Sequence, residues 1–178
     1  MNFSSESEMS VYFKTLLKDS FSEDSIDIIE EFSGLFGIPD YLLVEKNENS
    51  LKYVIAVELK LKNWNRALEQ AFKYKTFSNE SYVVIDEAVI VNVLKHKKEF
   101  IHYNVGLASF NKDKELKVYH YPKSNTPFSK YYIKKMESKI IGESTNSDII
   151  SLGVNGDKCI YNVESILPQK FTKLSINF

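Results

Sequence analysis

The stretch from residue 38 to residue 74 constrains the fold more than any other part of the chain. Within it, an apolar run that begins at Tyr53 is followed directly by Glu58, Leu59 and Lys60. Side chains alternate between the two faces of a strand, so Glu58 and Lys60 are expected on one face. The other face is apolar throughout and consists of Tyr53, Ile55, Val57, Leu59 and Leu61. A carboxylate and an ammonium at the end of a core strand are costly unless they are paired, hydrated or bound to a metal. The strand therefore predicts a polar site at its end.

Length and composition indicate one soluble domain. A chain of 178 residues is long enough to bury a core without disulfides. The single cysteine, Cys159, excludes an intramolecular disulfide and fits a reducing compartment. The first ten residues lack the basic and apolar segments of a secretory signal, and the longest aliphatic run is too short to cross a bilayer. We therefore expect a cytoplasmic location and no membrane partner.

The charge is distributed unevenly along the chain. Net charge is −1 overall, but residues 1–50 carry 11 acids and 3 lysines, whereas residues 51–140 carry 17 basic and 9 acidic residues. This asymmetry leaves room for a basic face toward phosphates beside an acidic pocket for cations. The alternative interpretation is that the lysines fill a solvated surface.

Hydrophobic periodicity predicts a helix followed by a β-hairpin in the first third of the chain. Apolar residues between 9 and 18 recur at i, i+3 and i+4, which predicts an amphipathic helix after a frayed segment at 1–8. Residues 26–32 fit a short strand or a helical turn. Residues 40–45 and 51–61 predict two antiparallel strands joined by a tight turn.

The remaining elements alternate between helices and strands. A helix capped by Asn63 or Asn65 is expected to run to about Phe77, and the apolar run at 81–85 predicts a central strand. Further along the chain we expect a helix at 87–100, strands at 105–110 and 116–121, a helix at 129–140, and a hairpin at 148–160 that turns at Asn155-Gly156. The pattern predicts an α/β fold with a mixed sheet.

Three charged residues of the predicted hairpin are expected to converge. Asp40 lies on one strand, and Glu58 and Lys60 lie on its neighbour. Two adjacent carboxylates repel each other, so a hard divalent cation is their natural partner. Such an ion lowers the pKa of its bound water, and a nearby lysine can orient or deprotonate that water and offset phosphate charge. Hydrolysis of a phosphodiester assisted by Mg²⁺ or Mn²⁺ accounts for all three residues.

The same residues resemble a known motif. Pro39-Asp40 followed by Glu58-Leu59-Lys60 is similar to the signature of the PD-(D/E)xK nuclease superfamily. The resemblance implies that Asp40 and Glu58 bind a metal, with the carbonyl of Leu59 as a third ligand. It gives Lys60 the catalytic role.

The helix after the hairpin extends the resemblance. Gln70 and Tyr74 are four residues apart and share a helical face, and their spacing resembles the QxxxY motif of the RecB-type branch. The resemblance implies that they support the site or the DNA backbone. Many family members also use an upstream glutamate, for which Glu31 and Glu30 are both candidates.

Other basic residues are weaker candidates for binding nucleic acid. Lys62 follows the strand that carries Lys60, and Arg66, the only arginine, lies in the first turn of the next helix. Lys130 and Lys134 belong to a basic side of the predicted helix at 129–140. Each of these residues also fits an ordinary solvated surface. The sequence contains no Walker loop and no zinc-binding pattern.

Taken together, the resemblance implies a restriction-endonuclease-like mixed sheet flanked by helices. We expect a nuclease core at 1–123 and a C-terminal extension, a helix and a hairpin, at 124–178. The expected activity is metal-dependent hydrolysis of phosphodiester bonds, with DNA as the substrate and a homodimer or a partner protein for targeting. The alternative is a nuclease-fold module that binds DNA or assembles with other proteins without catalysis.

Overall fold

Six strands form one mixed sheet in the order β1-β2-β3-β4-β5-β6. The computed structural model describes residues 2–21, 26–33, 35–47, 50–142 and 171. The elements in chain order are α1 (Glu6–Phe21), β1 (Ile26–Glu30), β2 (Tyr41–Lys46), β3 (Leu51–Lys60), α2 (Trp64–Tyr74), β4 (Glu80–Asp86), η1 (Glu87–Val89), α3 (Ile90–Leu94), α4 (Lys97–Tyr103), β5 (Gly106–Phe110), β6 (Leu116–His120) and α5 (Lys130–Ile141). The predicted α/β arrangement of a mixed sheet flanked by helices is confirmed.

Strand direction changes across the sheet. The pairs β1–β2, β2–β3 and β5–β6 are antiparallel, whereas β3–β4 and β4–β5 are parallel. The stretch at 26–32, which fitted two interpretations, forms strand β1 over Ile26–Glu30. All residues of β4 are buried, as expected for the centre of a sheet with both faces covered. The parallel step from β3 to β4 requires a crossover, and α2 provides it.

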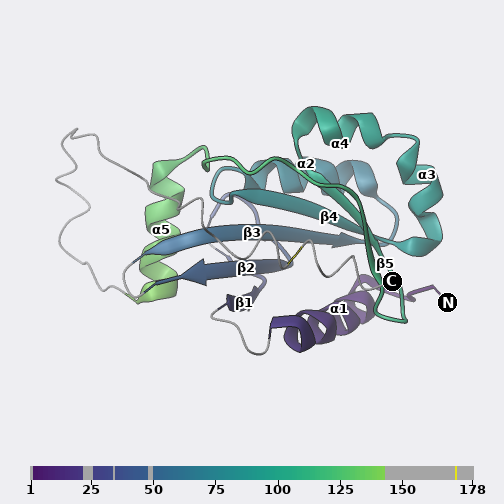
Figure 1. Cartoon of the computed structure of the whole chain (residues 1–178), viewed down its shortest axis with the longest axis horizontal. Helices are drawn as coiled ribbons and strands as arrows, with labels where there is room; N and C mark the ends of the chain where they lie inside the picture. The colour runs from purple at the N-terminus through teal and green to yellow at the C-terminus, as the bar shows by residue number, and fades with distance from the viewer. Residues whose placement is uncertain (1, 22–25, 34, 48–49, 143–170, 172–178) are drawn as a thin grey trace.

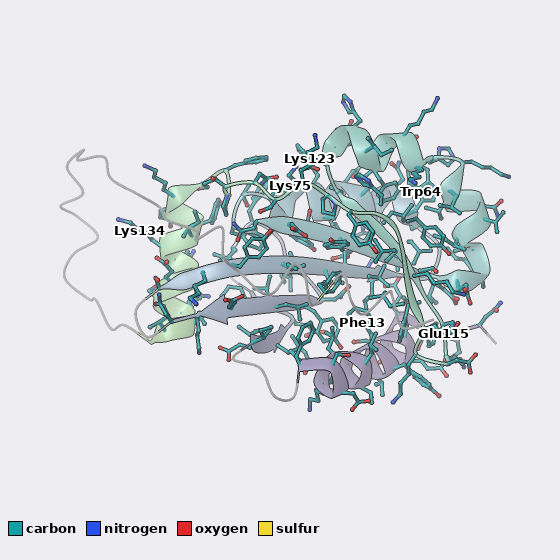
Figure 2. All side chains as sticks on the ribbon, viewed as in Figure 1. Phe13, Trp64, Lys75, Glu115, Lys123 and Lys134 are labelled. Atoms are coloured by element: carbon teal, nitrogen blue, oxygen red, sulfur yellow. The ribbon has the colours of Figure 1, made fainter. Side chains whose placement is uncertain are left out.

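Helices cover both faces of the sheet, and each face has its own hydrophobic core. Figure 1 shows α1 on one side and α2, α3 and α4 on the other. Phe13 of α1 is fully buried against the first face, where Figure 2 labels it. The core of the second face includes Ala67 and Leu68 of α2 and Met136 of α5.

Alternation along β3 agrees with the prediction. Tyr53, Ile55 and Val57 belong to the core on the α1 side, and Val54 and Ala56 belong to the core on the α2 side. Strand β3 is hydrogen-bonded to β2 on one side and to β4 on the other through most of its length. The register of β3 therefore fixes which of its side chains enter each core. The same parity places Glu58 on the α2 side.

The first helix begins earlier than expected. Residues 1–8 were predicted to be frayed, but α1 starts at Glu6. The side chain of Ser5 accepts a hydrogen bond from the backbone N–H of Glu8 at 3.0 Å, and the Glu8 carboxylate accepts one from the N–H of Ser4 at 2.6 Å. These two bonds form a capping arrangement that satisfies N–H groups that would otherwise lack partners. Phe3 is buried as well, which ties the segment to the core.

The prediction of a single helix at 87–100 is wrong. The chain instead forms a 3-10 turn, α3 and α4, with a break at Lys95-His96. Three of the five residues at 87–91 are β-branched, and such residues are weaker helix formers. At the break, the His96 ring stacks on Trp64 with centroids 4.3 Å apart. No helix in the described residues is long and apolar enough to span a membrane.

The helix predicted at 129–140 is present as α5. Ser129 caps it by accepting a hydrogen bond from the N–H of Tyr132, and Ile133 and Met136 are buried as expected. The segment before it is held at the end of α2, because the N–H of Phe128 donates to the carbonyl of Lys75 at 3.0 Å. The predicted hairpin at 148–160 lies outside the described residues.

Candidate functional site

The β2–β3 hairpin brings the two predicted carboxylates together. Tyr41 pairs with Val57, so Asp40, just before β2, lies beside the end of β3 that carries Glu58. Oδ2 of Asp40 accepts a hydrogen bond from the backbone N–H of Leu59 at 2.6 Å. This bond fixes the aspartate at the point where β3 leaves the core.

Lys60 lies among acceptors at the end of the strand. Its Nζ is 2.9 Å from Oε1 of Glu58, and it donates to the carbonyl of Leu59 at 3.0 Å. The same amine is 3.2 Å from Oε2 of Glu6, which lies in the first turn of α1. The lysine therefore links the hairpin to the helix on the other face of the sheet.

Tyr74 holds the second oxygen of the buried glutamate. Its hydroxyl donates to Oε2 of Glu58 at 2.6 Å and lies 3.0 Å from the carbonyl oxygen of Ile38. Both Tyr74 and Glu58 are only 1% exposed, so this contact excludes water. Tyr74 belongs to α2, which Asn63 caps by accepting from the N–H of Arg66. The choice between Asn63 and Asn65 as the cap is thereby resolved.

Gln70 lies one helical turn before Tyr74 on the same face of α2. Burial and the charge of Glu58 raise the pKa of the Tyr74 hydroxyl, and the contact with the Gln70 side chain only opposes this shift. Oε1 of Gln70 is buried and has no hydrogen-bond partner in the described part of the chain. A buried acceptor without a donor is unfavourable, so this oxygen is suited to a water molecule or to a donor on a ligand.

Gly37 allows the chain before Asp40 to approach Tyr74. Its φ is +99°, and a Cβ there would lie 2.8 Å from Cε1 of Tyr74. A side chain is disfavoured at this position both by the backbone conformation and by the ring. The close approach places the Ile38 carbonyl within hydrogen-bonding distance of the Tyr74 hydroxyl.

Burial and mutual charge shift the pKa values of Asp40, Glu58 and Lys60. Burial raises the pKa of Glu58, and the negative charge of Asp40 adds to this effect. Burial also raises the pKa of Asp40, although the hydrogen bond from Leu59 opposes the shift. Burial acts to lower the pKa of Lys60, but its contacts with Glu58, Asp40 and Glu6 outweigh burial and raise it. The lysine is therefore an ammonium at neutral pH, and one ammonium does not fully offset the carboxylates around it.

The donor set fits a hard divalent cation. Asp40 and Glu58 supply carboxylate oxygens, and the Leu59 carbonyl, which accepts a hydrogen bond from Lys60 at 3.0 Å, lies at the same end of β3. No group of three or more His, Cys, Asp or Glu side chains that could hold a metal occurs among the described residues. An ion here would therefore also use the main-chain oxygen and water. Magnesium accepts such a set, because it takes one or two carboxylates and keeps several waters.

The upstream glutamates differ in their contacts. Glu30 is in β1 and forms an ion pair with Lys14 of α1. Glu31 has a φ of +47°, and its charge contributes to the raised pKa of Asp40. Glu6, which sequence reasoning missed, is a second glutamate that contacts Lys60, in addition to Glu58. The capping pattern at Ser5 would have placed Glu6 in a helix, but no local pattern indicates that this helix meets β3.

The weaker basic candidates are exposed. Lys62 follows β3, and Arg66 lies in the first turn of α2, with its side chain in solvent. Lys130 and Lys134 are exposed on α5, and Figure 2 shows Lys134 projecting away from the sheet. Within the described part of the chain, none of these four side chains is hydrogen-bonded to Asp40, Glu58 or Lys60.

Comparisons with protein-family models, with curated proteins and with solved structures gave no match. The function is therefore inferred from the chemistry of the site and from the sequence resemblance.

Proposed function

We propose that the chain is a metal-dependent nuclease of the PD-(D/E)xK type that hydrolyses phosphodiester bonds in DNA. The observation that carries the proposal is the convergence of Asp40, Glu58 and Lys60 at the end of β3, where Lys60 Nζ lies 2.9 Å from Glu58. Tyr74 supports the arrangement from α2 through its 2.6 Å hydrogen bond to Glu58. The αβββαβ order around the hairpin, with a mixed sheet covered on both faces, is compatible with a restriction-endonuclease-like core.

Each residue has a role that its contacts support. Asp40, Glu58 and the Leu59 carbonyl would hold Mg²⁺ or Mn²⁺, which when bound supplies a water of lowered pKa and neutralises phosphate charge. The Lys60 ammonium offsets charge on the phosphate and orients the attacking water. Tyr74 holds one oxygen of Glu58 and so fixes its rotamer. Gln70, whose Oε1 has no partner in the described residues, would accept a hydrogen bond from bound water or from the substrate.

A cleavage assay tests the proposal. Labelled single-stranded, duplex and branched DNA and RNA are incubated with Mg²⁺ or Mn²⁺, and products are separated on a gel. We expect Asp40→Ala, Glu58→Ala and Lys60→Ala each to abolish cleavage while the thermal unfolding transition remains. Lys52→Ala is a matched control for Lys60→Ala, because Lys52 lies on the same strand and contacts Glu45 at 3.6 Å.

Metal-dependent cleavage that survives all three substitutions would overturn the assignment. Calorimetric titration with Mg²⁺ or Mn²⁺ separates the proposal from the alternative of a non-catalytic module. A nuclease should bind the ion, and Asp40→Ala and Glu58→Ala should weaken that binding. A folded chain that neither binds the ion nor cleaves any substrate would instead support the module.

A further inference from the structure

The loop before β2 and the helix α5 expose aromatic side chains to solvent. Phe36 is 46% exposed and Tyr131 is 64% exposed. The two segments are in contact, because the rings of Phe36 and Tyr132 have centroids 6.2 Å apart. Tyr131 in turn meets Tyr132 edge-on at 5.3 Å. Neighbouring exposed aromatic rings are uncommon on a monomer surface and indicate a binding face.

A lysine amine lies near each of the two exposed rings. Nζ of Lys73 lies 6.0 Å from the centroid of Phe36, and Nζ of Lys135 lies 5.9 Å from that of Tyr131. Nζ of Lys139 donates to the carbonyl of Ser33 at 3.0 Å, which holds α5 against the loop. Helix α5 carries four lysines and one glutamate, a net charge of +3. The face therefore combines flat apolar rings with positive charge.

This face connects with the candidate active site through the loop. The Ile38 carbonyl lies 3.0 Å from the Tyr74 hydroxyl that holds Glu58, and Asp40 is two residues further along the chain. Asp40 is four positions after Phe36 in the sequence, which is a reach of at most about 14 Å for an extended chain. At about 3.4 Å per stacked base, this distance corresponds to roughly four nucleotides. A strand lying on Phe36 can therefore reach the carboxylates.

We propose that this face binds single-stranded nucleic acid and leads it to the Asp40 and Glu58 site. The inference deepens the proposed nuclease function, on which it rests, by naming the class of substrate. Bases stack on the rings of Phe36 and Tyr131, and the lysine amines contact the phosphates. Ring faces accept bases only when those bases are unpaired, so the surface favours a single strand over a duplex. The stacking surface, as we name it, consists of Phe36, Tyr131, Lys73, Lys135 and Lys139.

A second exposed aromatic group also has lysines beside its rings, Lys73 and Lys75, but it carries carboxylates as well. Phe72 and Tyr103 line a groove of about 340 Å³ between α2 and α4. The same groove is lined by Glu69 and Glu99, whose carboxylates repel phosphates. Tyr103 is 43% exposed, close to the value for Phe36, so it provides a matched control.

A binding measurement without divalent metal tests the proposal on the full chain. Fluorescence anisotropy is measured with a labelled oligothymidine of roughly 12 nucleotides, within the usual range of site sizes, and with a duplex of equal length. We expect tighter binding of the single strand. Phe36→Ala and Tyr131→Ala should each weaken it by about 5- to 100-fold, and Tyr103→Ala should leave it unchanged. Phe36→Trp should retain binding, because it keeps a flat ring.

The outcomes separate this inference from the proposed function. If Phe36→Ala and Tyr131→Ala bind the single strand as tightly as Tyr103→Ala does, the inference is wrong, whether or not the protein cleaves DNA. Equal affinity for the duplex, or no binding of either nucleic acid, would also overturn it. If the protein cleaves no substrate but these two variants lose single-strand binding, the result would support the stacking surface and refute the proposed nuclease activity. Tyr131 is mostly exposed, so its substitution tests the surface even if Phe36→Ala destabilises the fold.

Discussion

Replacing Tyr74 by phenylalanine removes the hydroxyl that holds the buried glutamate. The hydroxyl donates to Glu58 at 2.6 Å in a place where Glu58 is 1% exposed, so no water can replace it without rearrangement. A hydrogen bond to a charged group contributes about 1.5–3 kcal/mol to stability. We therefore expect Tyr74→Phe to lower the free energy of unfolding by about 2 kcal/mol when Glu58 is ionised. For a chain of this size, that loss corresponds to a decrease in Tm of about 4–8 °C.

The effect of this substitution should depend on pH with a definite sign. Burial and Asp40 raise the pKa of Glu58, and the Tyr74 hydroxyl opposes them by stabilising the ionised form. Removing the hydroxyl raises the pKa of Glu58 further, so the variant loses most stability at high pH, where the carboxylate is charged. At low pH the protonated group accepts only a neutral hydrogen bond, and the loss falls to about 1 kcal/mol.

The measurement is urea unfolding of the two proteins at about pH 8 and about pH 5, without divalent metal. Tyr41→Phe is the matched control, because the hydroxyl of the buried Tyr41 bonds to the neutral Ser10, at 2.7 Å to its Oγ. The loss of stability caused by Tyr41→Phe should be the same at both pH values. An equal loss at both pH values for Tyr74→Phe would refute the reasoning that the hydroxyl stabilises a charged carboxylate.

Three further predictions concern the structure around the site. In urea unfolding, Gly37→Ala should lower the free energy of unfolding more than Gly142→Ala does. Both glycines have positive φ, but only at Gly37 would an added Cβ lie 2.8 Å from the Tyr74 ring. Equal losses would contradict the close approach of Gly37 to Tyr74. Glu80→Gln should flatten the decline in Tm with rising pH. Burial raises the pKa of Glu80 above its usual value of 4.5. The stability that the protonated Glu80 contributes is therefore fully present below pH 4.5 and is lost as pH rises through the pKa of the folded state. An unchanged slope of Tm against pH in the variant would argue against this assignment. Ser5→Ala should lower the stability measured by thermal unfolding by about 1 kcal/mol through loss of the helix cap; an unchanged Tm would show that the cap contributes nothing.

The sequence predicted the hairpin and its charged end because β3 is buried on both faces. A strict period of two then places Glu58 on one side, and a shift by one residue would bury the wrong set of side chains. The crossover helix was predicted for a similar reason, since its apolar residues repeat with helical spacing. Gln70 and Tyr74 could be placed on one face from spacing alone.

Sequence patterns did not predict the tertiary contacts. The contact between Glu6 and Lys60 joins residues 54 apart, and nothing local to either residue indicates it. The break near His96 was missed because a helical pattern continues across it, whereas the stacking of His96 on Trp64 favours a bend. The early start of α1 was also missed, although the spacing of Ser5 and Glu8 is a recognisable cap.

The separation between contacting residues also determines the order in which the site can assemble during folding. Asp40 meets Leu59 across 19 residues, and Glu58 meets Tyr74 across 16, so both contacts close short loops of low entropic cost. The Glu6 contact with Lys60 spans 54 residues and requires α1 to dock on the opposite face. From loop-closure entropy we therefore expect the contacts of Asp40 and Glu58 to form before those that join distant parts of the chain. We expect the docking of α1, which adds the Glu6 contact to the Lys60 ammonium, to come later.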